Sequence, residues 1–219
     1  MALIHIDMFI TLDGVAQAPG GPEEDAGGGF AFGGWQAPLW DDAVDDQVGS
    51  GLAEMDALLL GRRTYDIFFS YWPHEDGNIA QLLNRVPKYV ASRQTPFLEW
   101  HNSILLGPDV VEALHQLRDR HENIHVIGSL DFVQTLFTGL LFDRLTLWVY
   151  PILLGSGKKL FANGVVPTNL KLIEPVVASP KGAVMHQYLL ASGTPGVGEI
   201  HPAGMRVRAW SRRTKPWTG

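Results

Sequence analysis

The sequence contains no cysteine among its 219 residues. Disulfides, thiolate zinc sites and a thiol nucleophile are therefore excluded, and we expect a cytoplasmic protein, because disulfides are rare in the cytosol. Positive charge is also scarce: 17 Lys and Arg residues stand against 23 Asp and Glu residues, which gives a net charge of −6. This deficit argues against a nucleic-acid-binding protein, whose affinity comes from pairing cations with phosphates.

Long apolar runs are missing as well. Every long apolar window is interrupted by a charge, a glycine or a proline, so we expect no membrane-spanning segment. The first residues, "MALIHIDMFI", have no basic region and carry Asp7 within the apolar stretch, which is not the pattern of a signal peptide. Hydrophobic residues nevertheless make up 46% of the chain, which is enough to bury the core of one domain.

Apolar periodicity alternates between strand and helix over residues 1–192. After a first strand that stops at Asp13-Gly14, we expect strands within 57–60, 88–92, 124–128, 143–161, 170–178 and 182–190. Helical spacing is expected within 44–55, from about 63, and within 79–83, 109–117 and 133–137. This order predicts an α/β domain with a mostly parallel mixed sheet, helices on both faces and an antiparallel C-terminal edge.

Two segments do not follow this pattern. Residues 18–40 are rich in glycine, proline and aromatics, which predicts a long loop of functional importance. Aromatic side chains in and after it can either cover a flat substrate or pin the loop to the core; they are Phe30, Phe32, Trp35, Trp40 and Trp72. Residues 193–219 read as a linker and a basic tail, which we expect to contact the body or a partner subunit.

Turns with glycine, arginine and hydroxyl residues follow five of the expected strands. The carboxyl ends of parallel strands form the ligand-binding edge of such sheets, so these turns are expected to lie close together. Each alone is an ordinary connector, but together they offer the amides, hydroxyls and arginines that a phosphorylated dinucleotide needs. The spacings G-x-G-x-x-G and G-x-x-x-x-G-K-[ST] are absent. The turns are Asp13-Gly14, Gly61-Arg62-Arg63-Thr64, Ser92-Arg93, Gly128-Ser129 and Gly155-Ser156-Gly157.

The succession "ITLDG", "LLLGRRTY", "KYVASR", "IHVIGS" and "VYPILLGSGKKLF" resembles the dihydrofolate reductase-like family. Within it, the sequence is most similar to the reductase domain of riboflavin biosynthesis and its stand-alone bacterial relatives, over roughly residues 3–190. The resemblance implies a dihydrofolate reductase-like fold, NADPH as the hydride donor, a small-molecule substrate and a homodimer.

The resemblance also implies roles for individual residues. Arg62 and Thr64 match positions that hold the NADPH phosphates, and Gly61 matches one that allows close backbone approach. Ser92 and Arg93 match the strand end that flanks the 2′-phosphate.

Further matches concern the pyrophosphate and the nicotinamide. Gly128 and Ser129 match the paired glycines before the pyrophosphate-binding helix, although Ser129 and Leu130 stand where glycine is common. Gly14 and Val15 match the loop that faces the nicotinamide. Gly155, in the glycine-rich turn, is also expected to contact the cofactor.

Hydride transfer needs a proton source besides the cofactor, and two carboxylates are candidates. Asp13 lies in the loop expected to face the nicotinamide, and Asp45 falls near the helix position where folate reductases keep an acid. The alternatives are a turn aspartate and a solvated helix carboxylate. The expected function is a reductase for a heteroaromatic or carbonyl substrate of pyrimidine or pteridine type. The alternative is a nucleotide- or ligand-binding module without turnover.

The stretch "HENIH" matches the H-E-x-x-H pattern of zinc proteases. That pattern requires both histidines on one helical face, whereas His121 ends a predicted helix and His125 lies in a predicted strand. Strand residues four apart are separated by about 13 Å, too far to share one tetrahedral metal. We therefore expect no metal site.

Overall fold

The computed structural model describes residues 2–161, 165–199 and 208–209, and its centre is an eight-stranded sheet with the order β4-β3-β2-β5-β1-β6-β8-β7. Pairing is parallel from β4 to β6, while β8 runs antiparallel to both β6 and β7. This arrangement confirms the mostly parallel α/β fold with an antiparallel C-terminal edge. The strands are β1 Leu3–Thr11, β2 Ala57–Gly61, β3 Lys88–Ala91, β4 Ser103–Leu105, β5 Asn123–Val126, β6 Arg144–Tyr150, β7 Asn169–Ala178, β8 Val184–Ala191, β9 Gly198–Glu199 and β10 Arg208–Ala209.

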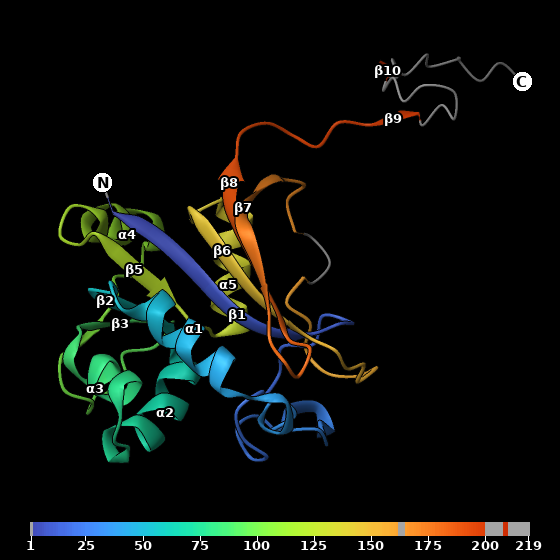
Figure 1. Cartoon of the computed structure of the whole chain (residues 1–219). Helices are drawn as coiled ribbons and strands as arrows, with labels where there is room; N and C mark the ends of the chain where they lie inside the picture. Colours follow the sequence, from blue (N-terminus) through green and yellow to red (C-terminus); the bar gives the residue numbers. More distant parts are fainter. Residues whose placement is uncertain (1, 162–164, 200–207, 210–219) are drawn as a thin grey trace, which may run out of the picture.

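Helices cover both faces of this sheet (Figure 1). The α-helices are α1 Asp42–Leu52, α2 Arg62–Tyr71, α3 Asn78–Arg85, α4 Val110–Arg118 and α5 Leu130–Gly139, with short 3-10 turns at Gly27–Gly29, Ala37–Leu39 and Trp72–His74. Two helices begin at the side-chain caps that the sequence offers. The carboxylate of Asp41 accepts a hydrogen bond from the Val44 amide, and that of Asp109 accepts one from the Glu112 amide.

Alternation along β1 divides its side chains between the two faces of the sheet. Ile4, Ile6, Met8 and Ile10 are buried in a core with α4 and α5. The intervening residues face the side that α1, α2 and α3 cover, and we call it the α1 face. Near β2 and β3 this face is apolar, with Leu58, Leu60 and Val90 packed against the three helices. Near β1 it carries the polar residues His5 and Asp7, followed by Phe9 toward the carboxyl end.

The loop over residues 18–40 is held to the α1 face by its aromatic side chains. Phe30 and Trp35 are buried in a cluster that contains Trp148 and Tyr150, and the Trp35 indole donates a 2.8 Å hydrogen bond to the carbonyl of Gln17. The remaining aromatics are partly buried or exposed. This packing supports the alternative in which the aromatics pin the loop to the core.

Several details could not be taken from the sequence pattern. The edge strand β4 was not predicted, because three residues are too few for an apolar alternation to be recognised. His125 lies in β5, as expected, and the described residues contain no group of three potential metal ligands. No helix in the described ranges is long and apolar enough to span a membrane. Residues 200–207 and 210–219 of the predicted basic tail lie outside the described residues.

Lys88 is a fully buried cation at the start of β3. Its Nζ donates hydrogen bonds to the carbonyls of Asn84 (2.7 Å) and His101 (3.0 Å) and lies 4.5 Å from the centre of the Trp100 ring. Burial lowers the pKa of Lys88 from 10.5 to about 8. The folded protein therefore releases this proton at a lower pH than the unfolded chain.

This difference predicts a stability change at alkaline pH. Between pH 8 and 10.5 the unfolded chain binds more protons at Lys88 than the folded protein, so the free energy of unfolding should rise with pH, by up to about 3 kcal/mol. Lys88→Met should lack this rise. Urea unfolding of the wild type and of Lys88→Met across this range measures the difference. The pKa values of Tyr89 and Tyr150 are also raised, but these tyrosines contribute the same pH dependence to both proteins. Parallel pH profiles would contradict the prediction.

Candidate functional site

The carboxyl ends of β2 and β5 lie in direct contact. The Gly61 amide donates a 3.0 Å hydrogen bond to the Gly128 carbonyl. A Cβ on Gly61 would lie 2.1 Å from Ser129 Oγ, and one on Gly128 would lie 2.7 Å from Thr64 Oγ1. Only glycine fits at either position, and the peptide bond between Gly128 and Ser129 is cis. Because of this close approach, helices α2 and α5 begin side by side.

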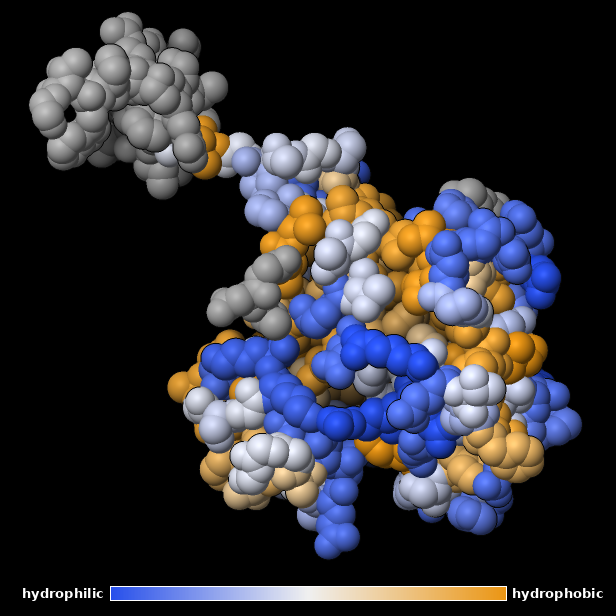
Figure 2. All heavy atoms as spheres, turned by 180° about the vertical axis from the view of Figure 1, so that it is seen from behind, coloured by the Kyte–Doolittle hydropathy of each residue, from blue (hydrophilic) through white to orange (hydrophobic). Residues whose placement is uncertain are grey.

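A small cavity of about 60 Å³ opens between these two helix starts, and we call it the edge cavity. Of the residues predicted to bind a cofactor, Thr64, Ser129 and Leu130 line it. Arg63 also lines it, although the sequence prediction chose Arg62. Helix N-termini present unpaired amides and a partial positive charge, so this position suits an anion. Hydrophilic residues ring the hollow at the centre of the face shown in Figure 2.

Asp25 reaches into the edge cavity from the loop over residues 18–40. Its carboxylate lies 2.5 Å from Lys158 Nζ and 3.3 Å from Arg63 Nη1. Burial opposes ionisation, but the hydrogen bonds from Lys158 and the Gly27 amide outweigh it and lower the pKa of Asp25. The loop thereby places its own carboxylate against the two cations that a phosphate would meet.

Arg62 lies at the same helix start but outside the lining of the edge cavity. Its guanidinium makes a bidentate pair with Asp66, with distances of 2.7 Å from Nη2 and 2.8 Å from Nε. The remaining nitrogen, Nη1, is buried without a hydrogen-bond partner among the described residues. One of the three guanidinium nitrogens of Arg62 is therefore not used in a hydrogen bond to a described residue.

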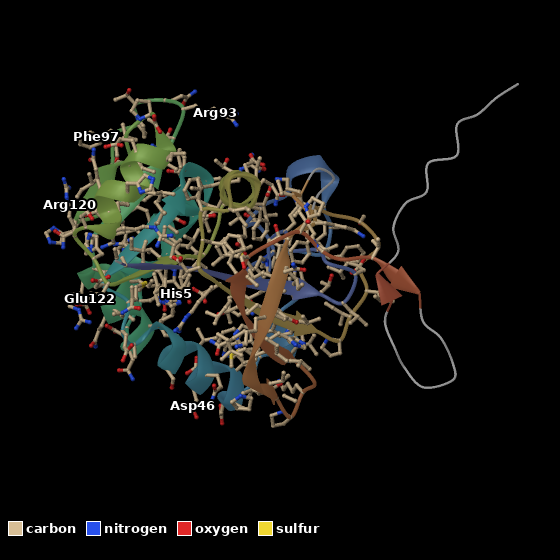
Figure 3. All side chains as sticks on the ribbon, turned by 90° about the horizontal axis from the view of Figure 1, so that it is seen from above. His5, Asp46, Arg93, Phe97, Arg120 and Glu122 are labelled. Carbon is tan, nitrogen blue, oxygen red and sulfur yellow. The ribbon has the colours of Figure 1, made fainter. Side chains whose placement is uncertain are left out.

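Ser92 and Arg93 follow β3, whose last residue Ala91 is in register with Gly61. They lie at the predicted edge of the sheet but not in the edge cavity. The Ser92 hydroxyl accepts a hydrogen bond from the Gln94 amide, and Arg93 is exposed and points away from the body of the molecule (Figure 3).

Asp13 ties two loops of the carboxyl edge together. It accepts hydrogen bonds from the Thr11 hydroxyl (2.5 Å) and the amides of Gly155 (2.8 Å) and Leu154 (3.3 Å). The Thr11 bond has the largest effect, and together these bonds lower the pKa of Asp13 to about 2. Gly14, at φ 82°, turns the chain so that Val15 can form an antiparallel bridge with Lys159. Asp13 has the contacts of a turn aspartate.

Asp45, the second predicted acid, is exposed on the first turns of α1. Neither Asp13 nor Asp45 lines a cavity that the structure describes.

A larger cavity of about 360 Å³ lies between the second half of α1 and the sheet, and we call it the α1 cavity. Strand register arranges its floor in three rows across β5, β1, β6 and β8. The row nearest the carboxyl edge is apolar and the next two are polar. From the carboxyl edge inward, the rows are Phe9-Trp148-Met185, Asp7-Thr146-Gln187 and His125-His5-Arg144.

The two polar rows hold a connected group of titratable side chains. His125 Nδ1 lies 2.7 Å from Asp7 Oδ2, and the His5 ring stacks on His125 with centroids 4.4 Å apart and planes inclined by 8°. Burial, followed by the neighbouring His125, lowers the pKa of His5 to about 4. His5 Nε2 and Arg144 Nε are buried without a partner among the described residues. Figure 3 shows His5 in the interior of the molecule, whereas Asp46 points outward from α1.

Sequence inspection missed this second site, although a signal was present. His5 and Asp7 interrupt the apolar run "LIHIDMFI", and His125 interrupts "IHVIG". Polar residues on predicted buried strands need partners, so three of them indicate either a polar network or a site.

Comparisons with known proteins agree with this architecture. The family model described as the RibD C-terminal domain matches residues 2–181. The uncharacterized protein YyaP of Bacillus subtilis (strain 168) is 25% identical over 178 residues, which cover 78% of this chain and 86% of that protein.

Solved structures share the fold at low sequence identity. A protein described as a riboflavin biosynthesis protein, from Shewanella sp. PV-4, superposes with a TM-score of 0.69 at 19% identity, covering 88% of this chain and 100% of that one. Dihydrofolate reductase from Enterococcus faecalis, complexed with NADP(H) and RAB-propyl, superposes with a TM-score of 0.56 at 14% identity, covering 87% of this chain and 97% of that one. The likeness to these structures shows a dihydrofolate reductase-like fold.

Proposed function

The chain belongs to the RibD C-terminal domain family, and from this premise we propose that it is an NADPH-dependent reductase of a heteroaromatic or carbonyl substrate of pyrimidine or pteridine type. The observation that carries the proposal is the arrangement of two cavities around one strand end. Ile127 lines the α1 cavity and Ser129 lines the edge cavity. Two residues span at most about 7 Å, so ligands in the two cavities can approach each other.

Part of the lining of the edge cavity suits the phosphates of a dinucleotide, while Glu24, Asp25 and Asp131 add carboxylates to it. Arg63 offers a guanidinium, Thr64 a hydroxyl, and the first turn of α5 offers amides from Ser129 and Leu130. The close packing of Gly61 against Ser129 and of Gly128 against Thr64 brings the starts of α2 and α5 together at this cavity. Asp25 must leave Arg63 and Lys158 before phosphates can bind there. The cofactor, when bound, supplies the hydride.

The α1 cavity supplies the substrate site in this proposal. Phe9 and Trp148 in the row nearest the carboxyl edge offer apolar surface to a flat ring. Asp7 in the middle row faces such a ring from its hydrogen-bonded position beside His125. The Asp7–His125 pair can hold a proton between Oδ2 and Nδ1, which gives the site the proton source that hydride transfer requires. This role replaces the one first expected of Asp13 and Asp45.

A binding module without turnover remains the alternative function. A protein that binds NADPH but oxidises it with no member of a panel of aminopyrimidine, dihydrofolate and simple carbonyl substrates would favour it.

The cofactor assignment predicts an effect of Arg63. Arg63→Ala should weaken the binding of NADPH and NADH alike by about ten- to a hundred-fold, because it removes a charge-assisted hydrogen bond to the pyrophosphate. Quenching of tryptophan fluorescence on titration measures both affinities. Glu23→Ala, which removes an exposed charge from the loop over residues 18–40, serves as the control. No quenching of the wild type at millimolar NADPH would refute the reductase proposal.

The proton assignment predicts an effect of Asp7. Asp7→Asn should lower kcat by about 10²- to 10⁴-fold with the substrate that the panel identifies, while the Kd of NADPH stays unchanged. Asp45→Asn, at the exposed position on α1, should keep wild-type kcat. Circular dichroism confirms that both variants are folded. If Asp45→Asn loses activity and Asp7→Asn does not, the proton source lies on α1 and the present assignment is wrong.

We also propose that the protein forms a homodimer through β7. This strand is the edge of the sheet and exposes Leu170, Leu172 and Val176. Hydrophobic residues gather at the top of the body, where the chain leaves β8 (Figure 2). Light scattering should give twice the chain mass of 24.1 kDa, and Leu172→Glu should shift it toward the monomer. A wild-type mass of 24.1 kDa at micromolar concentration would exclude the dimer.

A further inference from the structure

The edge cavity is too small, in the conformation of the structure, for a ligand with two phosphates. Small-molecule sites usually enclose about 300–1,000 Å³, whereas the edge cavity holds about 60 Å³. Part of its wall comes from the loop over residues 18–40, through Ala18, Glu24 and Asp25. A phosphate-bearing ligand can therefore enter only if this part of the loop moves.

Asp25 makes the contacts in the edge cavity that an anionic ligand would make. Its Oδ2 lies 2.5 Å from Lys158 Nζ and 3.3 Å from Arg63 Nη1, and its Oδ1 accepts a 3.0 Å hydrogen bond from the Gly27 amide. Only 15% of the Asp25 side chain is exposed, so solvent and salt screen these contacts less than those of a surface pair. A carboxylate and a phosphate cannot occupy this position together, so the two compete for the same cations.

The other carboxylates that line the edge cavity are placed differently. Glu24 closes a tight turn, because its Oε2 accepts hydrogen bonds from the amides of Gly20 (2.7 Å) and Gly21 (3.2 Å). Asp131 is exposed on the first turn of α5. Within the described residues, both ion pairs of the edge cavity use the carboxylate of Asp25. Asp25 is therefore the internal competitor for its cations.

A run of three glycines separates Asp25 from the pinned part of the loop. Gly27–Gly29 form a short 3-10 turn, with φ values of 71° and 74° at its last two residues, and Phe30 directly after it is buried. Glycine lacks the side chain that restricts backbone dihedrals. Residues 19–29, which we call the Asp25 arm, can therefore turn about these glycines while Phe30 stays in place. Opening breaks the hydrogen bonds from Gln17 Nε2 to the carbonyls of Asp25 (3.0 Å) and Gly27 (2.8 Å).

We propose that Asp25 is an autoinhibitory residue: its carboxylate occupies the anion site of the edge cavity, and the Asp25 arm must swing out before a diphosphate-bearing ligand can bind. The closed arm lowers the affinity of the site, and ligand binding is coupled to arm opening. The proposal rests on the proposed function for the identity of that ligand as NADPH. The inhibition itself rests on the small cavity, the two shared cations and the glycines beside Asp25.

The competition is tested with inorganic pyrophosphate, by isothermal titration calorimetry on the full chain. Asp25→Asn keeps the shape of the side chain and removes its charge. This variant should bind pyrophosphate about three- to ten-fold more tightly than Glu23→Gln does. Glu23→Gln is the matched control, because it removes an equal charge from an exposed position of the same arm. NADPH, titrated by tryptophan quenching, should show the same order.

The opening of the arm is tested by NMR. When pyrophosphate binds to the wild type, the amide signals of Gly27, Gly28 and Gly29 should shift toward the positions that they take in Asp25→Asn without ligand. The signal of Gly139, at the far end of α5, should not move. Unshifted signals of the three glycines at saturation would overturn the proposal, and this measurement stands even if Asp25→Asn does not fold.

The proposal also fails if Asp25→Asn binds pyrophosphate no more tightly than Glu23→Gln, or if neither the wild type nor Asp25→Asn binds it. The NADPH titration separates these results from the proposed function. Tighter pyrophosphate binding by Asp25→Asn without any NADPH binding leaves the inhibition standing and removes the reductase. NADPH binding of equal affinity in Asp25→Asn and Glu23→Gln keeps the reductase and removes the inhibition.

Discussion

The parallel pairing of β1 between β5 and β6 is the constraint on which the rest of the structure depends. Because the three strands run in the same direction, their following turns meet at one edge, where α2 and α5 begin side by side. Because their register is set, His5, Asp7 and Phe9 face α1 in rows with residues more than a hundred positions away. A slip of one residue would move all three to the opposite face, among the buried isoleucines of β1.

The fold, and the edge of the sheet at which the glycine turns meet, could be predicted from the sequence. Apolar alternation and helical spacing predicted the strands and helices, and the turns around Gly61 and Gly128 predicted the edge of the sheet where they meet. Both kinds of pattern involve residues close together in the sequence. Contacts made across long sequence distances could not be predicted. Asp25 meets Arg63 only because the loop over residues 18–40 folds back, and the Asp7–His125 pair needs the register of two strands 118 positions apart. For Asp13, the local pattern allowed both a catalytic and a structural role.

The proposed division of labour between the two cavities would let a common fold serve a particular substrate. The edge cavity lies between the starts of two helices that the glycine contacts bring together, and charged side chains of Arg63, Lys158 and Asp25 line it. The α1 cavity is built from side chains on the central strands, each of which can change without altering strand pairing. Low identity to solved structures is therefore compatible with a preserved fold and a different choice of substrate.

The contacts of Asp25 give the edge cavity an internal counter-ion. With its carboxylate between Lys158 and Arg63, Asp25 offsets one of these two positive charges before any ligand arrives. A singly charged anion from solution would only exchange one negative charge for another, and would also have to displace a loop pinned by Phe30 and Trp35. A ligand with several negative charges gains more from the same two cations than the carboxylate does. In the proposed function, this competition with Asp25 favours polyanionic ligands over the simple anions of the surrounding solution.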